Sequence, residues 1–217
     1  MAVTLPRTDI LSSAAFRQAM FTLPPTQRFS VTEGGSLLAE ESTSALWQCM
    51  YETVPMLHTE AVTFEAKLRS LAGMVHGFYA YDLRRPYPAA YPDGVFSDTG
   101  TIHTLGSDNK SMRIDNLPAN FQLSVGDYLA FDYGDADYDV PDARALHQVM
   151  EDVTASGAGL TASFEVYPPI RDNAAVGAAV TLKTPSALFV LTPENFEPSI
   201  QDVMFGSVSF KGIQYLP

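Results

Sequence analysis

The sequence predicts a mainly β protein with one amphipathic helix. Its 14 glycines and 15 prolines make up 29 of 217 residues and separate short apolar runs, as turns separate strands. Only residues 59–73 carry apolar side chains at helical spacing. With 217 residues, of which 46% are hydrophobic, the chain can bury a core of its own. Its length fits one or two domains.

Apolar runs bounded by turn residues predict a series of strands. Residues 111–117 show the clearest period of two, with Met112 and Ile114 on one side and Arg113 and Asp115 on the other. No element is predicted between residues 22 and 44. The expected strands are Phe16–Phe21, Ala45–Val54, Met74–Tyr81, Thr101–Leu105, Ser111–Ile114, Tyr128–Phe131, Ala145–Met150, Leu160–Val166, Ala178–Leu182, Ala187–Leu191 and Val208–Tyr215.

The predicted helix spans Thr59 to Gly73. Its apolar stripe, at spacings of 3, 4 and 3, consists of Ala61, Phe64, Leu68 and Leu71. Thr59 is a suitable N-cap, Glu60 suits the positive N-terminal end, and Gly73 can adopt the left-handed conformation after the last turn. We expect the stripe to pack against a sheet.

Two breaks divide the chain. The segment Arg84–Gly94, RRPYPAAYPDG, has three prolines in eleven residues, which disfavours both a helix and a central strand. A second break lies near Pro185. The roughly 90 residues between the breaks suffice for a small β-barrel or sandwich. We therefore expect residues 1–95 and 186–217 to form one discontinuous domain, with residues 96–185 inserted into it.

Charge and cysteine content exclude several partner classes. The chain has 13 Lys and Arg against 25 Asp and Glu, a net charge of -12, which argues against direct nucleic-acid binding. With four lysines and no apolar stretch of about 18 residues, no membrane partner is expected, and no signal peptide is readable. Cys49 is the single cysteine, so an internal disulfide is excluded, and it is expected to be a small buried hydrophobe.

A search for catalytic motifs finds no nucleophile elbow, P-loop, Rossmann fingerprint or zinc-protease motif. The histidines His58, His76, His103 and His147 stand singly. His76 and His147 lie in predicted apolar strands, where a hydrogen-bonded structural role is expected. The motif search therefore gives no support for an enzyme or a cofactor, and neither is expected.

The acidic run DYGDADYDVPD contains the one weak metal candidate. Asp135, Asp137 and Asp139, at spacing two, resemble the start of a calcium loop. Its sixth position would be Val140 instead of glycine and its twelfth Leu146 instead of glutamate. We expect a solvated hairpin tip, with a weak calcium site as the alternative.

Two blocks of the sequence resemble one known family. The first, residues 47–82, has a Trp47 strand, a Pro55-Met56-Leu57 turn, a helix ending with Leu68, Leu71 and Gly73, and then Phe78 and Asp82. The second, residues 115–191, contains Asp115-Asn116-Leu117-Pro118, Gly126-Asp127-Tyr128-Leu129, Leu146-His147-Gln148-Val149 and Pro168-Pro169-Ile170-Arg171. In this order the blocks resemble the distal tail proteins of long-tailed bacteriophages (siphoviruses).

The resemblance implies a structural protein of the virion, at the distal end of the tail, made in the host cytoplasm. It implies a β-sandwich belt domain with one helix and an outward OB-like or galectin-like β domain. Six copies would form a ring that joins the tail tube protein to the baseplate hub and can anchor receptor-binding or side-fibre proteins. The expected core of the belt consists of Trp47, Phe64, Leu68, Leu71 and Phe78.

Two other function classes remain open at this point. A two-domain β carbohydrate-binding module of a tail or cell-surface protein would use exposed aromatics that stack on sugar rings. Its candidates are Tyr87, Tyr91, Tyr128, Tyr133 and Tyr138, which also suit ordinary packing. A β-barrel enzyme would need a pocket that the sequence does not reveal.

Overall fold

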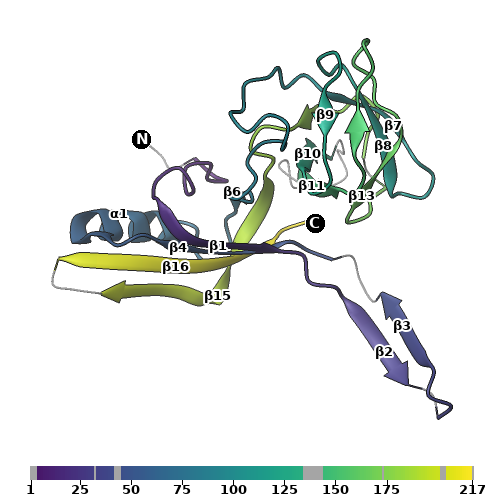
Figure 1. Ribbon diagram of the computed structural model, residues 1–217. Coiled ribbons are helices and arrows are strands. Elements are labelled where there is room, and N and C mark those ends of the chain that lie inside the picture. Colours follow the sequence, from purple (N-terminus) through teal and green to yellow (C-terminus); the bar gives the residue numbers. More distant parts are fainter. Residues whose placement is uncertain are drawn as a thin grey trace.

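The fold was analysed in a computed structural model that describes residues 4–31, 33–41, 45–133, 144–172, 174–200 and 204–216. Within these ranges the protein is mainly β with a single α-helix, which confirms the predicted fold class. Two six-stranded sheets dominate, and there are two further sheets of two strands each (Figure 1). No helix in the described part is long and apolar enough to cross a membrane.

The first sheet combines strands from both ends of the chain. Its order is β1-β4-β16-β15-β6, and β5 also pairs with β16. All of these pairs are antiparallel. The strands are β1 Phe16–Thr22, β4 Gln48–Thr53, β5 Met56–Leu57, β6 Phe78–Ala80, β15 Ala187–Ile200 and β16 Phe205–Gln214. This order places β4, from the N-terminal part of the chain, beside the last strand β16, as a discontinuous domain requires.

Strand β4 shows why the sheet has two unlike faces. Cys49, Tyr51 and Thr53 are buried, while Met50 and Glu52 between them are partly exposed. Because side chains alternate across a strand, one face of the sheet meets the core and the other meets solvent. In Figure 1, α1 and the second sheet lie above the first sheet, on its core side.

The helix α1, His58–Arg69, packs on the core face through Ala61, Phe64 and Leu68. The predicted cap is wrong: Leu57 precedes the helix and makes no side-chain capping bond, and Thr59 lies in the first turn. The N–H of His58 instead donates to the carbonyl of Met204 at 3.1 Å, because the β5–β16 pairing leads directly into the helix. Pairing with the sheet thus replaces the side-chain cap.

The helix ends earlier than Gly73, although the left-handed conformation predicted there is observed. Ala72 and Gly73 have φ values of 49° and 67°, in a turn that follows α1. The N–H of His76 bonds back to the Leu71 carbonyl at 3.0 Å. Residues 74–77 therefore belong to this turn, and the expected strand from Met74 begins only at Phe78. His76 is accordingly a turn residue, against the prediction.

The first core lies between α1 and this sheet. Trp47, Phe64, Leu68, Leu71 and Phe78 are each at most 3% exposed and belong to one apolar cluster. Aromatic contacts connect them to the strands, with Phe64 6.0 Å and Phe78 5.9 Å from the ring of Phe210. Burial of these large side chains is the main force that holds the helix on the sheet.

The second sheet is a nearly closed barrel in the order β14-β10-β11-β13-β8-β7. A bridge between Thr101 and Ala179 joins its first and last strands, supported by a Val180 N–H to Gly100 carbonyl bond of 2.8 Å. The strands are β7 Thr101–Leu105, β8 Ser111–Asp115, β10 Tyr128–Asp132, β11 Arg144–Val149, β13 Phe164–Tyr167 and β14 Val180–Thr181. The small pair β9 Gln122–Leu123 and β12 Val153–Thr154 lies beside them.

Strands β10 and β11 belong to two cores at once. Leu129 and Phe131 face the second core, inside the barrel, whereas Tyr128 and Ala130 join the first core. The indole N–H of Trp47 also donates to the Leu146 carbonyl at 2.8 Å. The two sheets therefore share packed strands, and the predicted boundaries at residues 95 and 186 stay a prediction.

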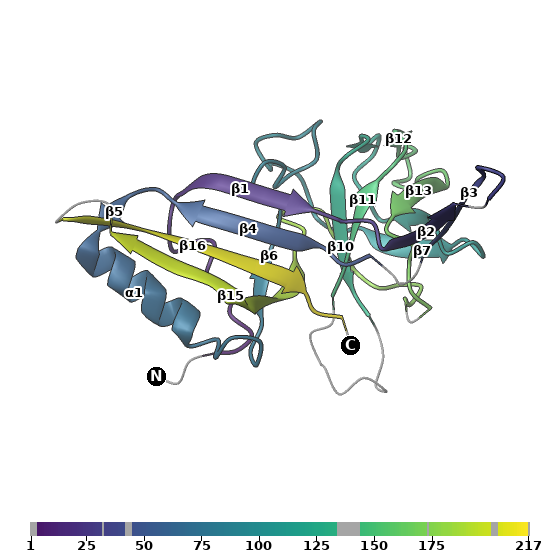
Figure 2. The ribbon, with the colours of Figure 1, turned by 90° about the horizontal axis from the view of Figure 1, so that it is seen from below.

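One hairpin is absent from the sequence-based prediction. Strands β2 Gln27–Val31 and β3 Leu37–Glu41 pair only with each other among the described strands. Figure 1 shows that this hairpin projects away from both larger sheets, and Figure 2 shows it beyond the end of the first sheet. Strand β15 also runs to Ile200, well beyond the predicted end at Leu191, with an irregularity in its pairing between Leu191 and Phe196.

Candidate assembly surface

The projecting hairpin β2–β3 carries an apolar face that meets solvent. Phe29 pairs with Ala39 and Val31 pairs with Leu37, so all four positions lie on one face. Phe29, Val31 and Leu37 are 75%, 65% and 65% exposed. A two-stranded hairpin is at best marginally stable alone in water. The hairpin thus has the properties of a segment that becomes buried in a contact with another molecule.

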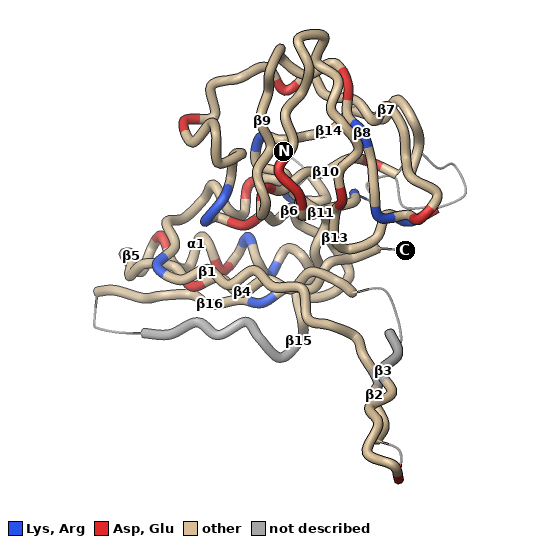
Figure 3. The backbone as a smooth tube through the Cα atoms, turned by 45° about the vertical axis from the view of Figure 1, so that its right-hand side comes forward, with Lys and Arg blue, Asp and Glu red and all other residues tan. Residues whose placement is uncertain are grey.

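The connection to β1 holds the hairpin away from its own sheet. Pro24 and Pro25 lie between β1 and β2, and proline restricts the backbone to extended conformations there. In Figure 1 the hairpin extends below the first sheet, on the side opposite α1. The turn between β2 and β3 carries Glu33, and Figure 3 shows acidic colouring at the lower end of the hairpin.

The outer face of the first sheet is the second exposed surface. No described helix or strand layer covers it, and Met20 is 47% exposed there, with Met50 and Ile213 partly exposed. These three residues help to line a groove of about 390 Å³. Lys211 is the charged side chain among the described residues of this groove. Methionine adapts to partners of different shape, so such a groove is a suitable docking surface.

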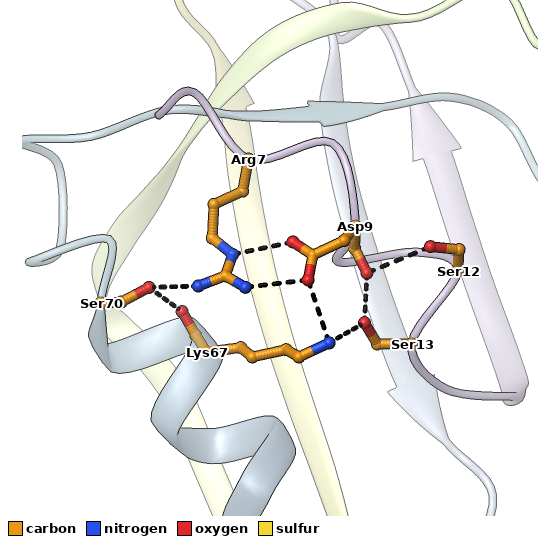
Figure 4. Close-up of polar contacts among 6 residues, drawn as sticks. All are labelled: Arg7, Asp9, Ser12, Ser13, Lys67 and Ser70. Carbon is orange, nitrogen blue, oxygen red and sulfur yellow. Dashed lines mark hydrogen bonds and ion pairs between the residues drawn. The ribbon is translucent and has the colours of Figure 1, made fainter. Parts of the chain in front are cut away.

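A polar network fixes the N-terminal segment on the helix (Figure 4). Asp9 receives two 2.8 Å hydrogen bonds from Arg7 and a 3.0 Å ion pair from Lys67. Arg7 also donates to Ser70 at 2.9 Å, and Lys67 donates to Ser13 at 2.5 Å. The hydrogen bond from Arg7, with the help of Lys67, holds the pKa of Asp9 well below its usual range.

The same segment covers part of a sheet edge. The N–H of Arg7 donates to the Gly77 carbonyl at 3.0 Å, and the N–H of Tyr79 donates to the Arg7 carbonyl at 2.9 Å. Arg7 thereby extends the sheet beside β6. A free strand edge can pair with another chain, so this backbone pairing protects part of the edge at β6.

A second network joins the two sheets. The guanidinium of Arg84 donates to Asp82 at 2.9 and 2.7 Å, and the Tyr128 hydroxyl donates to Asp82 at 3.2 Å. Burial acts to raise the pKa of Asp82, but the contacts with Arg84 outweigh it and lower that pKa. Asp127 is fully buried and accepts bonds from Arg85 at 3.1 Å and from the Ala89 N–H at 2.9 Å. This joint holds the barrel in one orientation on the first sheet.

Among the described residues, the predicted chemical candidates are not brought together in one site. Asp135, Asp137 and Asp139 lie outside the described residues. Within the described part of the chain, no group of three or more His, Cys, Asp or Glu side chains is placed to hold a metal ion. Cys49 is 3% exposed, and burial raises the pKa of its thiol.

The histidines occupy unrelated places. His58 begins α1, and His103 lies 3.0 Å from Asp115 on the barrel. His147 is buried inside the barrel, stacked on Phe131 at 5.3 Å, with Nδ1 2.7 Å from the Pro168 carbonyl. Its Nε2 has no hydrogen-bond partner among the described residues. Burial lowers the pKa of His147 to about 4, and the nearby charge of Arg171 acts in the same direction.

The described tyrosines among the candidates for stacking on sugars are largely used in packing. Tyr91 stacks on Phe121 at 4.4 Å, and Tyr128 is 7% exposed in the first core. Tyr133 packs against Phe131, and burial raises its pKa to about 12. Tyr87 is partly buried, and Tyr138 lies outside the described residues. Because Tyr128 is buried and Tyr133 is partly buried, the four tyrosines that the structure describes do not form a common exposed platform.

Comparison with known proteins adds no relative: no protein-family model matches the chain, and no curated protein matches it significantly. The surfaces described above and the resemblance seen in the sequence are therefore the two indications of function.

Sequence reasoning missed the hairpin, although a signal for it exists. Residues 28–31 alternate polar and apolar side chains, and the run Glu33-Gly34-Gly35-Ser36 separates them from the apolar Leu37-Leu38. A glycine-rich run of four residues between two such segments is a typical hairpin signal. Gly35 adopts φ +79° there.

Proposed function

We propose that this protein is a structural component of a phage tail tip that assembles head-to-tail into a ring of six copies. The observation that carries the proposal is the apolar face of the hairpin β2–β3, which projects into solvent from an otherwise well-packed molecule. A hairpin and a sheet groove on one chain are different surfaces. Contact between them is heterologous, and such contacts generate closed rings when the rotation closes.

The resemblance supplies the identity of the assembly. In that family a ring joins the tail tube to the baseplate hub, and it can anchor receptor-binding or side-fibre proteins. We extend these partners and the virion location to this chain as part of the proposal. A mainly β domain with one helix and an inserted β-barrel is compatible with that role.

The proposal assigns the protein no catalytic step. Its work is mechanical: the packed cores keep each copy rigid, and the exposed surfaces determine the contacts between copies. The joint between Asp82, Arg84 and Tyr128 would keep the barrel at a fixed angle outside such a ring.

Electron microscopy combined with light scattering tests this proposal. The purified chain, alone and mixed with the tail tube and hub proteins of the same phage, should give particles with six-fold symmetry. A ring of this chain alone should have a mass of about 142 kDa, six times the 23.6 kDa of one chain. A chain that stays monomeric under all of these conditions and binds glycans would overturn the proposal in favour of a carbohydrate-binding module.

A further inference from the structure

The hairpin β2–β3 exposes an apolar face, and the outer face of the first sheet has an apolar groove that is complementary to it. Phe29, Val31 and Leu37 form a solvent-exposed apolar face on the hairpin. The open face of the first sheet carries a groove whose lining includes the apolar side chains Met20 and Met50. An apolar face and an adaptable apolar groove are complementary in chemistry.

The charges also match. The hairpin residues 27–41 contain Arg28 against Glu33, Glu40 and Glu41, so the segment has a net charge of -2. Lys211, which lines the groove, is exposed and positive. An acidic segment is therefore attracted to this groove and is disfavoured at the acidic surfaces of a chain with net charge -12.

The hairpin is poorly placed to fill the groove of its own chain. Pro24 and Pro25 direct it away from β1, and Figures 1 and 2 show it standing clear of the first sheet. Since extended proline segments are stiff, folding back onto the sheet is disfavoured. The groove of another copy faces no such restriction.

We propose that the apolar face of the hairpin β2–β3 of one copy docks into the groove at Met20, Met50 and Ile213 of a second copy. This inference rests on the proposed ring, because it names the surfaces through which neighbouring copies would meet. Phe29 is the most exposed apolar side chain of the face and serves as its anchor.

Cysteine cross-linking tests the contact directly. One variant carries Leu37→Cys on the hairpin, a second carries Met20→Cys in the groove, and the native Cys49 is buried and does not compete. After mild oxidation of the mixture, a covalent dimer of the two variants is expected on a non-reducing gel. The control mixture pairs Leu37→Cys with Val75→Cys, which is 72% exposed in the turn after α1, and should give no such dimer.

A charge placed on the anchor gives a second, independent measurement. Phe29→Asp should weaken self-association at least tenfold in analytical ultracentrifugation, because the anchor would carry a charge into an apolar groove. Ser30→Asp is the matched control: it adds the same charge one residue away, on the opposite face of the hairpin. Ser30→Asp should leave association within about twofold of the native chain.

The outcomes separate this inference from the proposed function. One outcome is that six-fold particles form, but the hairpin-to-groove cross-link is absent and Phe29→Asp does not weaken association. This outcome would overturn the proposed contact but not the proposed ring. A cross-link that forms only within one chain of the Leu37→Cys/Met20→Cys double variant would show that the hairpin fills its own groove, which also overturns it. Absence of both particles and cross-links would overturn the contact and the ring together.

Discussion

The barrel and the first sheet are both built from antiparallel strands, but the barrel is nearly closed and the first sheet is open. The barrel closes through the Thr101–Ala179 bridge and fills its interior with apolar side chains. The first sheet buries one face and leaves the other open, next to a hairpin whose apolar face meets solvent. The barrel pairs its first and last strands and buries its apolar side chains, whereas the first sheet and the hairpin leave apolar surface exposed. We therefore propose that assembly takes place through the first sheet and the hairpin.

The largest effect is expected from a charge placed under α1. Leu68 is 1% exposed between the helix and the first sheet, so Leu68→Asp would bury an unpaired carboxylate and remove packing. We expect a loss of more than about 4 kcal/mol, enough to prevent folding of the first sheet. Circular dichroism and thermal melting measure it.

Val62→Asp is the matched control for Leu68→Asp, since Val62 lies on the same helix and is 59% exposed. It should shift the unfolding free energy by no more than about 0.5 kcal/mol. A folded Leu68→Asp protein with a native melting temperature would contradict the assignment of Leu68 to the first core.

Truncation of one phenylalanine to alanine in the barrel and of another in the hairpin tests whether the barrel is a packed core and the hairpin an exposed surface. Phe164→Ala, inside the closed barrel at 1% exposure, should cost about 3–5 kcal/mol in urea unfolding. Phe29→Ala, at 75% exposure, should leave the stability of the single chain within about 0.5 kcal/mol. Equal losses at the two positions would mean that the hairpin is part of the folded core and not an assembly surface.

The sequence predicts these two regions unequally, for a physical reason. The strand Ser111–Asp115 was expected to within one residue, because burial on one side of the barrel imposes a period of two. The helix was recognised from its stripe, but its start was misplaced, because the bond from His58 to Met204 is a contact distant in sequence. Local sequence patterns therefore predict that an element exists more reliably than they predict the residues at which it begins and ends.

The candidate assembly surface was the least predictable part. Phe29 and Val31 are mostly exposed within one chain, so they contribute to neither core, and only a short alternating run and the glycine-rich turn after it signal a hairpin. The groove at Met20, Met50 and Ile213 combines strands from both ends of the sequence. A surface that depends on such long-range pairing is not visible in any single segment.

Acidification should weaken the barrel before it affects the carboxylate networks. The pKa of His147 is about 4 when folded and near 6.5 when unfolded, so the unfolded chain binds the extra proton between these values. Stability is therefore lost as the pH falls from about 6.5 to about 4, by up to about 3 kcal/mol. Asp82 and Asp115 have lowered pKa values, so their contribution is lost only below about pH 4, as they take up protons.

Urea unfolding at pH 7, 5.5 and 4.5 checks this expectation. His147→Gln should flatten the dependence on pH in this window, whereas His58→Gln, at the start of α1, should keep it. An unchanged pH dependence in His147→Gln would show that other groups dominate the acid response.

The smallest effect is expected at the N-terminal network, which ties a surface segment to α1. Asp9 is 42% exposed on its side chain, so solvent screens its ion pairs, and Asp9→Asn should cost only about 1 kcal/mol. This corresponds to a melting temperature about 2–4 °C lower for a chain of this size. Glu65→Gln, which removes only the helical pair with Arg69, should cost about 0.5 kcal/mol or less. If Asp9→Asn instead costs as much as Phe164→Ala, the segment is part of the core, and the edge beside β6 depends on it far more than its exposure indicates.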